Sequence, residues 1–552
     1  MNSIAHQPDG QAIDHETDVA IVGAGPVGTL LAILLGQRGH RVTLVERWTR
    51  HYSLPRAVTY DHEIARILAM LGIDSETDPA VNSHDELYYW RNRDGKDLQI
   101  VDWQSQSASG WRVRYWFNQP MLEKRLLALA EDLPSVTILR GWNGIALDQD
   151  AEGVTLSIKQ NPEEYGAEGE RRTIRAKYLA GTDGANSFVR ESLGIENEDR
   201  GYFFDWLILD MIPQFDYCAS RPDEPAQWQL CDPRRPTTIV PGGPGPLPGG
   251  PDRRRWEFMA LPGESIQDLQ STDTAWQLLA PWGLTPENAE LERAAVYRFQ
   301  ARWARQWNKG RCLIGGDAAH LMPPFAGEGM CAGLRDALAM GWRLNMILDG
   351  RAGPGLLDSY TTERKEHAKH YISFSQELGN IICISDEAEA AERDTRMIAE
   401  LARRNGRPVP TDICHLGPGA WSDGSAHAGE LSVQGVVDYR GRRDRFDQAV
   451  GRGWVVIGHD VDPLQALTEA QRAQLAALEG FGVVIGAAGS GAEVIDTDGT
   501  YARWLGEIDA RYVLIRPDFY VAATANTPES FRRRFDEVMA RLDLTAPQVV
   551  AA

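Results

Sequence analysis

The ten residues from Val19 to Gly28, VAIVGAGPVG, constrain the fold of this chain more than any other segment. An apolar run typical of a buried strand leads into a Gly-x-Gly-x-x-Gly turn and then into a helical pattern. We expect Gly23 to form the tight turn, Gly25 to let backbone approach a phosphate, and Gly28 to let helix and strand pack closely. The free N–H groups and positive dipole end of such a helix suit a pyrophosphate. The segment therefore predicts a Rossmann-like dinucleotide site.

An acid stands where the ribose of a bound dinucleotide is expected. Glu46 ends the predicted strand that begins at residue 41 and comes 18 residues after Gly28, near the spacing at which an acid accepts hydrogen bonds from the adenosine ribose. A carboxylate there disfavours a 2′-phosphate, so FAD or NAD fits this site better than NADP. The uncharged stretch 19–36 is not a membrane span, because four glycines and a proline interrupt it.

Charge and cysteine usage narrow the partners of the chain. The 57 Lys and Arg residues against 78 Asp and Glu residues give a net charge of −21, which repels nucleic acid and anionic membrane surfaces. The six cysteines have neither Cys-x-x-Cys nor metal-ligand spacing, and the sequence shows no secretion signal. We therefore expect a cytoplasmic protein with free thiols, no metal site, no nucleic-acid partner and no membrane partner.

Two later segments complete the predicted cofactor site. TDGANSFVR, residues 182–190, has the pattern of a strand end, a turn and a helix start, and GGDAAHLMPPFAGEGM spans residues 315–330. Asp317 could cap the helix that follows it. The two glycines directly before it, Gly315 and Gly316, and its place in the motif favour contact with a flavin instead. We interpret His320 as a structural hydrogen-bonding residue rather than a base, because buried polar side chains usually have a partner. With the first glycine turn, these segments predict one FAD site.

In that order, the three segments resemble the flavoprotein aromatic hydroxylases of the para-hydroxybenzoate hydroxylase class. Four further segments, CDPRRPTTIVPGG, RRWEFMALPGE, LLDSYTTERKEHA and YVLIRPDFYVAAT, resemble the 3-(3-hydroxyphenyl)propionate hydroxylases within that class, and the resemblance covers essentially the whole chain. It implies an FAD-dependent monooxygenase that uses NADH or NADPH and O2. The implied reaction is ortho-hydroxylation of a 3-hydroxyphenylpropionate-like phenolic acid to a catechol. No second glycine fingerprint is present, which fits a nicotinamide co-substrate that binds transiently.

The resemblance also implies which residues contact the cofactor. Arg56 is implied at the pyrophosphate, Gln119 and Asp317 at the ribityl chain, and Asp183 and Gly184 near both the flavin and the nicotinamide. The segment Gly327 to Met330, at a helix start, is placed to donate N–H groups to the flavin. The full implied cofactor set is Gly23, Gly25, Gly28, Glu46, Arg47, Arg56, Gln119, Asp183, Gly184, Asp317, Pro324, Gly327, Gly329 and Met330.

The catalytic group is less sharply indicated by the sequence. A phenol hydroxylase needs a dry pocket and help in removing the phenolic proton, yet residues 201–270 contain no histidine. Pro324 is implied beside the reacting ring, and the candidates for proton removal are Tyr217, Asp210 or a water relay. A substrate carboxylate would need a cation, for which the candidates are Arg234, Arg235, Arg254 and Arg255.

Two positions depart from the pattern of the class. Glu328 stands where many relatives have glutamine, and Phe325-Ala326 replaces smaller or hydroxylated residues. We expect Glu328 to be ion-paired or to point to solvent, and Phe325 to narrow the substrate cavity. Two alternatives stay open: a hydroxylase of polyketides or other bulky phenols, and a flavin-binding protein without oxygenase turnover.

The predicted fold class is α/β, with a Rossmann-like FAD-binding domain interleaved with a β-rich substrate domain and followed by a thioredoxin-like domain. The C-terminal domain contains no cysteine after Cys414, so we expect it to lack dithiol chemistry and to be structural or to form a subunit contact, as in a homodimer. The predicted boundaries are 15–200 for the first FAD-binding part, with a substrate-domain excursion near 85–115, then 201–285 for the substrate domain, 286–400 for the second FAD-binding part and long helices, 401–440 for a linker and 441–552 for the C-terminal domain.

Overall fold

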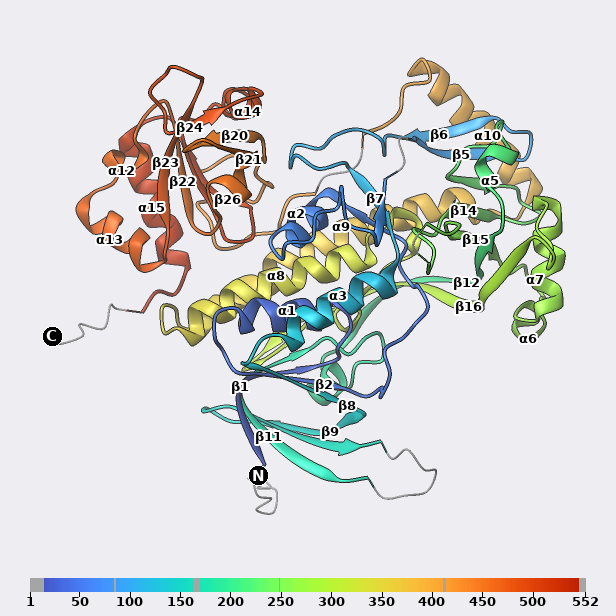
Figure 1. Cartoon of the computed structure of the whole chain (residues 1–552), viewed down its shortest axis with the longest axis horizontal. Coiled ribbons are helices and arrows are strands. Elements are labelled where there is room, and N and C mark those ends of the chain that lie inside the picture. The colour runs from blue at the N-terminus through green and yellow to red at the C-terminus, as the bar shows by residue number, and fades with distance from the viewer. Residues whose placement is uncertain (1–13, 84–85, 162–168, 248, 411–413, 546–552) are drawn as a thin grey trace.

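The computed structural model in Figure 1 describes residues 14–83, 86–161, 169–247, 249–410 and 414–545. Residues 546–552 of the predicted C-terminal domain and 162–168 of the first predicted FAD-binding part therefore lie outside the described residues. Within the described ranges, no helix is both long and apolar enough to cross a membrane.

The first sheet carries the N-terminal glycine turn. Its strand order is β17-β18-β11-β1-β2-β8, in which the five strands from β18 to β8 run parallel, and β10 and β9 extend it antiparallel from β11. The carboxyl ends of β1, β11 and β18 lie in register at one edge, where a doubly wound sheet binds its ligand. The strands are β1 (His15–Val22), β2 (Val42–Glu46), β8 (Val136–Arg140), β9 (Trp142–Gln149), β10 (Val154–Gln160), β11 (Arg171–Gly181), β17 (Asn308–Lys309) and β18 (Cys312–Ile314).

Three helices cover one face of this sheet. Helix α1 (Pro26–Gly36) packs between α3 (Gln119–Glu131) and α8 (Gly329–Leu348). Every residue of α1 from Gly28 to Gly36 is buried, as expected for a helix that is apolar on all sides. Packing of α1 against α8 brings the first and last segments of the predicted cofactor site together.

The second sheet forms the opposite wall of the site. Its order is β19-β16-β12-β15-β14-β13-β5-β6. The long strands β12 and β16 pair antiparallel along most of their lengths, although the sequence placed residues of β16 in the second FAD-binding part. The strands are β5 (Tyr88–Asn92), β6 (Asp97–Val101), β12 (Asn197–Pro213), β13 (Trp228–Cys231), β14 (Thr237–Pro241), β15 (Arg254–Met259), β16 (Ala289–Ala304) and β19 (His320–Leu321).

The two faces of the second sheet differ because successive side chains of a strand alternate. On β15, Trp256 and Phe258 pack into an apolar core with residues of α5 (Tyr217–Ser220), α6 (Ile266–Leu269) and α7 (Thr272–Leu279). Arg255 and Glu257 therefore point to the other face, toward the first sheet. A short third sheet, β3 (Thr59–Asp61), β7 (Arg114–Phe117) and β4 (Val81–Asn82), lies beside that face.

Several helices connect these layers. Helix α8 begins at the site and runs toward the C-terminal sheet, and α9 continues the chain back across the molecule (Figure 1). The remaining helices before residue 405 are α2 (His62–Ala69), α4 (Phe188–Ser192), α9 (Asp358–Ile382), α10 (Glu387–Arg403), η1 (Ala280–Trp282), η2 (Gly316–Ala318), η3 (Pro324–Ala326) and η4 (Pro354–Leu357).

The C-terminal part is a separate sheet with helices on both faces. Its order is β21-β20-β24-β23-β22-β25-β26; α13 and α15 pack with α8 on one face, whereas α11 and α14 cover the other. Its strands are β20 (Val436–Tyr439), β21 (Arg442–Arg445), β22 (Val455–His459), β23 (Phe481–Gly486), β24 (Val494–Asp496), β25 (Tyr512–Ile515) and β26 (Val521–Ala525). Its helices are α11 (Phe446–Ala449), α12 (Pro463–Ala466), α13 (Glu469–Ala477), α14 (Thr500–Glu507) and α15 (Pro528–Arg541).

Candidate functional site

The three glycines of the first turn have three different surroundings. Gly23 has φ +103°, and a Cβ there would lie 2.4 Å from the carbonyl oxygen of Thr182. A Cβ at Gly28 would lie 2.0 Å from the carbonyl oxygen of Gly23. At Gly25, no heavy atom of the described residues comes within 4 Å of the Cβ position. Gly23 and Gly28 therefore permit close backbone packing, whereas Gly25 faces open space.

The N-terminus of α1 is open at the same point. Gly25 is its N-cap and Pro26 its first residue; among the described residues, no side chain caps its N–H groups and its first turn holds no acid. A helix end of this kind attracts an anionic ligand through its free N–H groups and its dipole.

Two cavities meet at this helix end. The outer cavity, of about 210 Å³, reaches from the glycine turn to Glu46 and Trp142. The inner cavity, of about 310 Å³, reaches from the same turn to the second sheet. Because they share lining residues, the two cavities adjoin at this turn, the arrangement that an extended dinucleotide requires, and together they are called the channel. The shared residues are Gly25, Pro26, Arg56, Gln119, Thr182 and Gly184.

Glu46 and Arg47 border the outer cavity. The Glu46 carboxylate accepts hydrogen bonds from the backbone N–H groups of Ala24 and Trp48, both at 2.9 Å. Glu46 thus ties the end of β2 to the glycine turn, and its remaining lone pairs are available to a ribose hydroxyl. The Arg47 guanidinium lies over the indole of Trp48, 5.3 Å from its centroid.

Arg56 and Gln119 stand at the junction of the two cavities. The Gln119 side-chain oxygen accepts from the backbone N–H groups of Arg56 and Ala57, at 2.8 and 2.6 Å, while its amide nitrogen donates to Glu123. The Arg56 guanidinium lies 4.5 Å from the ring centroid of Tyr52. Gln119 at the start of α3 therefore positions the loop that carries the Arg56 cation.

Asp183 and Gly184 follow β11 on the opposite side of the junction. The Asp183 carboxylate accepts from the Ser187 hydroxyl at 2.5 Å and from the Val189 backbone N–H at 3.1 Å, so it fixes the turn into α4. Burial raises the pKa of Asp183. Gly184 has φ +83° and open space at its Cβ position, which leaves its backbone facing both cavities.

The buried carboxylate of Asp336 fixes the loop after β18 through hydrogen bonds. The sequence reasoning missed this residue. Asp336 accepts from the Gly316 backbone N–H at 2.9 Å and pairs with His320 Nε2 at 2.8 Å and Arg364 Nε at 2.9 Å. The partner of His320 fits its interpretation as a structural residue. Asp317 borders the inner cavity. Its side chain is exposed toward this cavity, and the protein that surrounds the carboxylate raises the pKa of Asp317 by desolvation.

The start of α8 closes the inner cavity. Pro324, Gly327, Gly329 and Met330 all border it, and the helix begins at Gly329. Glu328 points away into a buried charge cluster, where it accepts from Arg114 Nη2 at 2.9 Å and from Arg335 Nη1 at 3.0 Å.

Glu328 is thus ion-paired, one of the two outcomes expected for it. Burial, reinforced by the nearby Asp61 carboxylate, raises its pKa to about 7. The sequence does hold a signal for one partner of Glu328. Arg335 comes seven residues later on α8, and residues i and i+7 share a helix face.

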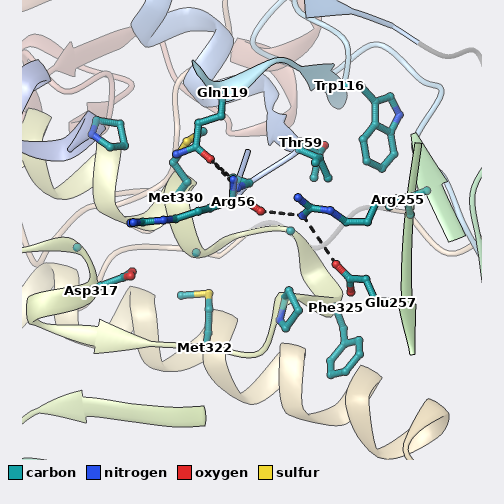
Figure 2. Close-up of a pocket in the computed structure, with 18 of the residues that line it drawn as sticks. Arg56, Thr59, Trp116, Gln119, Arg255, Glu257, Asp317, Met322, Phe325 and Met330 are labelled. Atoms are coloured by element: carbon teal, nitrogen blue, oxygen red, sulfur yellow. Dashed lines mark hydrogen bonds and ion pairs between the residues drawn. The ribbon is translucent and has the colours of Figure 1, made fainter. Parts of the chain in front are cut away.

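The far wall of the inner cavity combines aromatic side chains with one polar row. Figure 2 shows Glu257, which belongs to that row, with Trp116 and Phe325 beside the cavity. Gln229, Thr238 and Glu257 are consecutive partners across β13, β14 and β15, so their side chains share one face. Thr238 donates to the Gln229 side-chain oxygen at 2.6 Å, and the Gln229 amide donates to the Tyr88 hydroxyl. The aromatic and apolar lining comprises Tyr88, Trp103, Trp116, Val240, Met322 and Phe325.

Arg255 links this wall to the cofactor loop. It donates to Asp210 Oδ1 at 2.7 Å and to Oδ2 at 3.3 Å, and to the carbonyl oxygens of Arg56 and Pro55 at 2.7 and 3.1 Å. Asp210 also pairs with Arg293 at 2.7 Å. Asp210 is therefore fully buried behind Arg255 and is not among the described residues that border the cavity.

The other residues proposed for substrate contact lie elsewhere. Tyr217 packs edge-on against Trp256 on the opposite face of the second sheet. Arg234 pairs with Asp232, Arg235 with Glu264, and Arg254 donates to the Ala226 carbonyl oxygen. The sequence reasoning missed Glu257, because no local pattern in β15 (RRWEFM) marks which of its charged residues reaches the cavity.

The shape and the polar groups of the channel fit FAD. The two cavities adjoin at the open helix N-terminus at Gly25, and Arg56 and Asp317 supply polar partners along the channel. Chemically, such a channel can place a flavin ring against an aromatic-lined chamber.

Comparison with known proteins agrees with this geometry. A family model described as an FAD binding domain matches residues 16–375, and one described as the HcaD C-terminal domain matches 429–541. The chain is 36% identical over 521 residues to a probable NADH-specific resorcinol 4-hydroxylase of Rhodococcus jostii (strain RHA1), with 94% of each chain covered. It is 30% identical over 574 residues to a 3-(3-hydroxy-phenyl)propionate/3-hydroxycinnamic acid hydroxylase of Escherichia coli (strain K12), covering 99% of this chain and 98% of that one.

Two solved structures share the fold. The flavin-dependent monooxygenase PieE, in complex with FAD and substrate, superposes with a TM-score of 0.77 at 20% identity, covering 96% of this chain and 100% of that chain. Aklavinone-11 hydroxylase with FAD and aklavinone gives a TM-score of 0.74 at 24% identity, with the same coverage.

Proposed function

Because this chain belongs to the family of FAD-dependent aromatic hydroxylases, we propose that it hydroxylates an uncharged, meta-substituted phenol at a carbon ortho to the hydroxyl. It is a flavoprotein monooxygenase, with FAD as cofactor and a reduced nicotinamide as reductant. Resorcinol is the simplest substrate of the proposed class, and NADH is the proposed reductant.

The names of the two curated relatives support the substitution pattern. One is named for resorcinol, whose two hydroxyls are meta to each other, and the other for a phenol that carries a propionate at the meta position. A meta-substituted phenol is the feature that the two substrates have in common. Position 4 of resorcinol is ortho to one hydroxyl and para to the other, so this relative's name is compatible with the proposed ortho position.

The hydrogen bonds that Arg255 already makes are the observation that favours an uncharged substrate. Arg56 and Arg255 are the cations among the described residues that line the inner cavity. Arg56 stands at the cofactor junction, and four hydrogen bonds engage the Arg255 guanidinium, which has five N–H groups. One N–H group of Arg255 is left, and its Nη1 lies 3.8 Å from the Glu257 carboxylate, so a substrate carboxylate would meet a cation that Asp210 and Glu257 already neutralise. This favours a resorcinol-like phenol over the phenolic acid expected from the sequence.

The remaining residues have roles that follow from position. We propose that Gly23, Gly25, Gly28, Glu46 and Arg47 hold the ADP part of FAD, with Arg56, Gln119 and Asp317 along its pyrophosphate and ribityl chain. Asp183, Gly184, Pro324 and the segment Gly327 to Met330 would surround the flavin ring. When bound and reduced, FAD reacts with O2 and supplies the electrophilic oxygen. The aromatic wall would keep water away from that chemistry.

The proposed function is tested by substrate-stimulated oxidation of NADH by the holoenzyme, with products identified by mass spectrometry. Resorcinol and 3-methylphenol are expected to stimulate oxidation and to yield one hydroxylated product per NADH, whereas 3-(3-hydroxyphenyl)propionate stimulates weakly. Preference for the phenolic acid would overturn the charge argument. Lack of stimulation by every phenol would favour a flavin-binding protein without turnover, and turnover restricted to bulky polyketide phenols would favour that alternative.

We also propose that the C-terminal part has a thioredoxin-like arrangement without redox chemistry. The order β23-β22-β25-β26, with β22 and β23 parallel and β25 antiparallel to both of its neighbours, supports the arrangement. The absence of cysteine from the sequence after Cys414 supports the redox-inert role. Full hydroxylase activity after alkylation of all accessible thiols is the expected result.

A further inference from the structure

Glu257 is an acid set into the far wall of the substrate chamber. It lies on β15 between Trp256 and Phe258, which point to the opposite face of the sheet. Residue exposure of Glu257 is 6%, and its side chain borders the inner cavity. Figure 2 shows it across the cavity from Asp317, the second acid among the described lining residues. The two acids thus lie at opposite ends of the chamber.

The carboxylate of Glu257 is poorly partnered for a buried acid. Its nearest cation is Arg255, whose Nη1 lies 3.8 Å from Oε1, beyond hydrogen-bond length. None of the described residues donates a hydrogen bond to it. The neighbouring acid Asp210 contrasts with it, because Arg255 and Arg293 satisfy both of its oxygens. A structural carboxylate would be expected to resemble Asp210, since buried charges are normally paired.

The register of the sheet places Glu257 at the end of a polar row. Thr238 is its direct partner on β14, and Ile208 is its partner on β12. Thr238 donates toward Gln229 and away from Glu257. The row therefore leaves the Glu257 oxygens available to a group inside the chamber, beside hydroxyls that can orient a phenol.

Burial and the neighbouring charges set the pKa of Glu257 close to neutral pH. Burial raises its pKa to about 7, with Arg255 and Arg293 lowering it and Asp210 raising it. These three groups come from β15, β16 and β12, the strands packed around it. A base whose pKa lies near the working pH transfers protons efficiently. A base must border the cavity and have an oxygen free to accept a proton. Tyr217 lies on the opposite face of the sheet, and both oxygens of Asp210 are paired with arginines.

We propose that Glu257 is the catalytic residue that accepts the phenolic proton of the substrate. This inference rests on the proposed function of the site. The substrate O–H bond breaks, its proton passes to a Glu257 oxygen, and the electron pair stays on the phenolate oxygen. That pair activates the ortho carbon toward the oxygen that FAD, NADH and O2 supply. The ring hydrogen at that carbon leaves as a proton when the ring regains aromaticity, and Glu257 returns its own proton to solvent.

The first test compares the pH dependence of turnover in the wild-type holoenzyme and in Glu257→Gln. The wild-type kcat/KM is expected to fall as pH drops through about 7, where Glu257 becomes protonated. Glu257→Gln should lose this acid limb and reduce kcat by roughly 10²- to 10⁴-fold, the usual contribution of a general base. Glu257→Asp should recover part of the rate and retain an acid limb.

The matched control is Asp205→Asn, which removes an acid from β12 of the same sheet. Asp205 pairs with Arg298 at the surface and is not among the described residues bordering the cavity, so its kinetics should equal wild type. FAD content and thermal unfolding confirm that each variant is folded. An unchanged acid limb in Glu257→Gln, or a rate within threefold of wild type, would overturn the proposal.

A binding titration separates this inference from the proposed function. The probe is 3-nitrophenol, a meta-substituted phenol whose phenolate is coloured, added to the oxidised holoenzyme below the pKa of the free phenol. The wild type should bind it as phenolate and Glu257→Gln as phenol. Absence of phenol turnover would sink the proposed function alone, whereas identical bound spectra in both proteins would sink the role of Glu257.

Discussion

The Arg516 guanidinium donates to both oxygens of Glu363, at 2.9 and 2.7 Å. Both side chains are fully buried, and they join the end of β25 to helix α9. Glu363 also accepts from Arg343 at 2.6 Å. Although burial raises the pKa of Glu363, Arg343 and Arg516 lower it to about 2. The C-terminal sheet is thus tied to the rest of the molecule by a buried ionic contact.

Replacing Arg516 with alanine is expected to lower the free energy of unfolding by about 3–5 kcal/mol, because it leaves buried carboxylates short of a partner. Chemical denaturation of the holoenzyme measures the change. The control is Arg541→Ala, which breaks an exposed pair with Asp423 and should cost about 1 kcal/mol or less. Equal costs for the two variants would contradict a structural role for the buried contact.

Alanine at Gly25 and at Gly28 should fail in different ways. Gly25→Ala meets open space, so the variant should fold with wild-type stability but bind FAD at least tenfold more weakly, because its methyl occupies the phosphate approach. Gly28→Ala forces a Cβ against the Gly23 carbonyl and should lose about 1–3 kcal/mol of stability. Thermal unfolding of apoprotein and flavin titration distinguish them; loss of stability in Gly25→Ala would refute this assignment.

Removal of the Asp317 carboxylate should weaken FAD retention by about 1.5–3 kcal/mol, the range for hydrogen bonds to charged groups. The measurement is the dissociation constant of FAD, obtained by flavin fluorescence during dialysis. Glu196→Ala, which removes an exposed acid at the surface, is the control. Purified Asp317→Ala with full flavin content and normal product yield would exclude a ribityl contact.

Alanine at Glu46 should also weaken FAD binding, by about 1.5–3 kcal/mol, and for two reasons. It removes the acceptor proposed for the ribose, and it releases the Ala24 N–H that steadies the glycine turn. Glu46→Gln retains an oxygen for that N–H and should show a smaller loss. Isothermal titration of apoprotein with FAD tests the order; equal affinities in all three proteins would be incompatible with it.

The position of the glycine turn beside the two cavities was predictable because its determinants are local; the cofactor contacts of its residues stay predictions. A glycine turn between strand and helix has the same geometry wherever the chain places it, so Gly23, Gly25 and Gly28 were assigned from spacing alone. The convergence of Gly184 and Asp317 on that turn followed from the family resemblance. It has a simple cause in the parallel register of β1, β11 and β18.

The substrate wall was harder to predict because it depends on strand pairing. Asp210 and Glu257 are both acids in apolar strands, and no local pattern says which one reaches the cavity. The register sets Arg255 directly beside Asp210, which neutralises that acid, and sets Thr238 beside Glu257, which does not. Contacts between residues distant in sequence, such as Tyr520 with Glu63 at 3.0 Å, were equally invisible.

The bonds from Arg255 to the carbonyl oxygens of Pro55 and Arg56 have a consequence for how such a site changes over time. They fasten the cofactor loop to the substrate wall through main-chain atoms, whose identity does not vary with sequence. Under the proposed function, the distance between the flavin and this wall would therefore be inherited with the backbone. Thr238 and Val240 line the cavity, so under the proposed function we expect single substitutions there to change which ring carbon is presented while the cofactor stays in place.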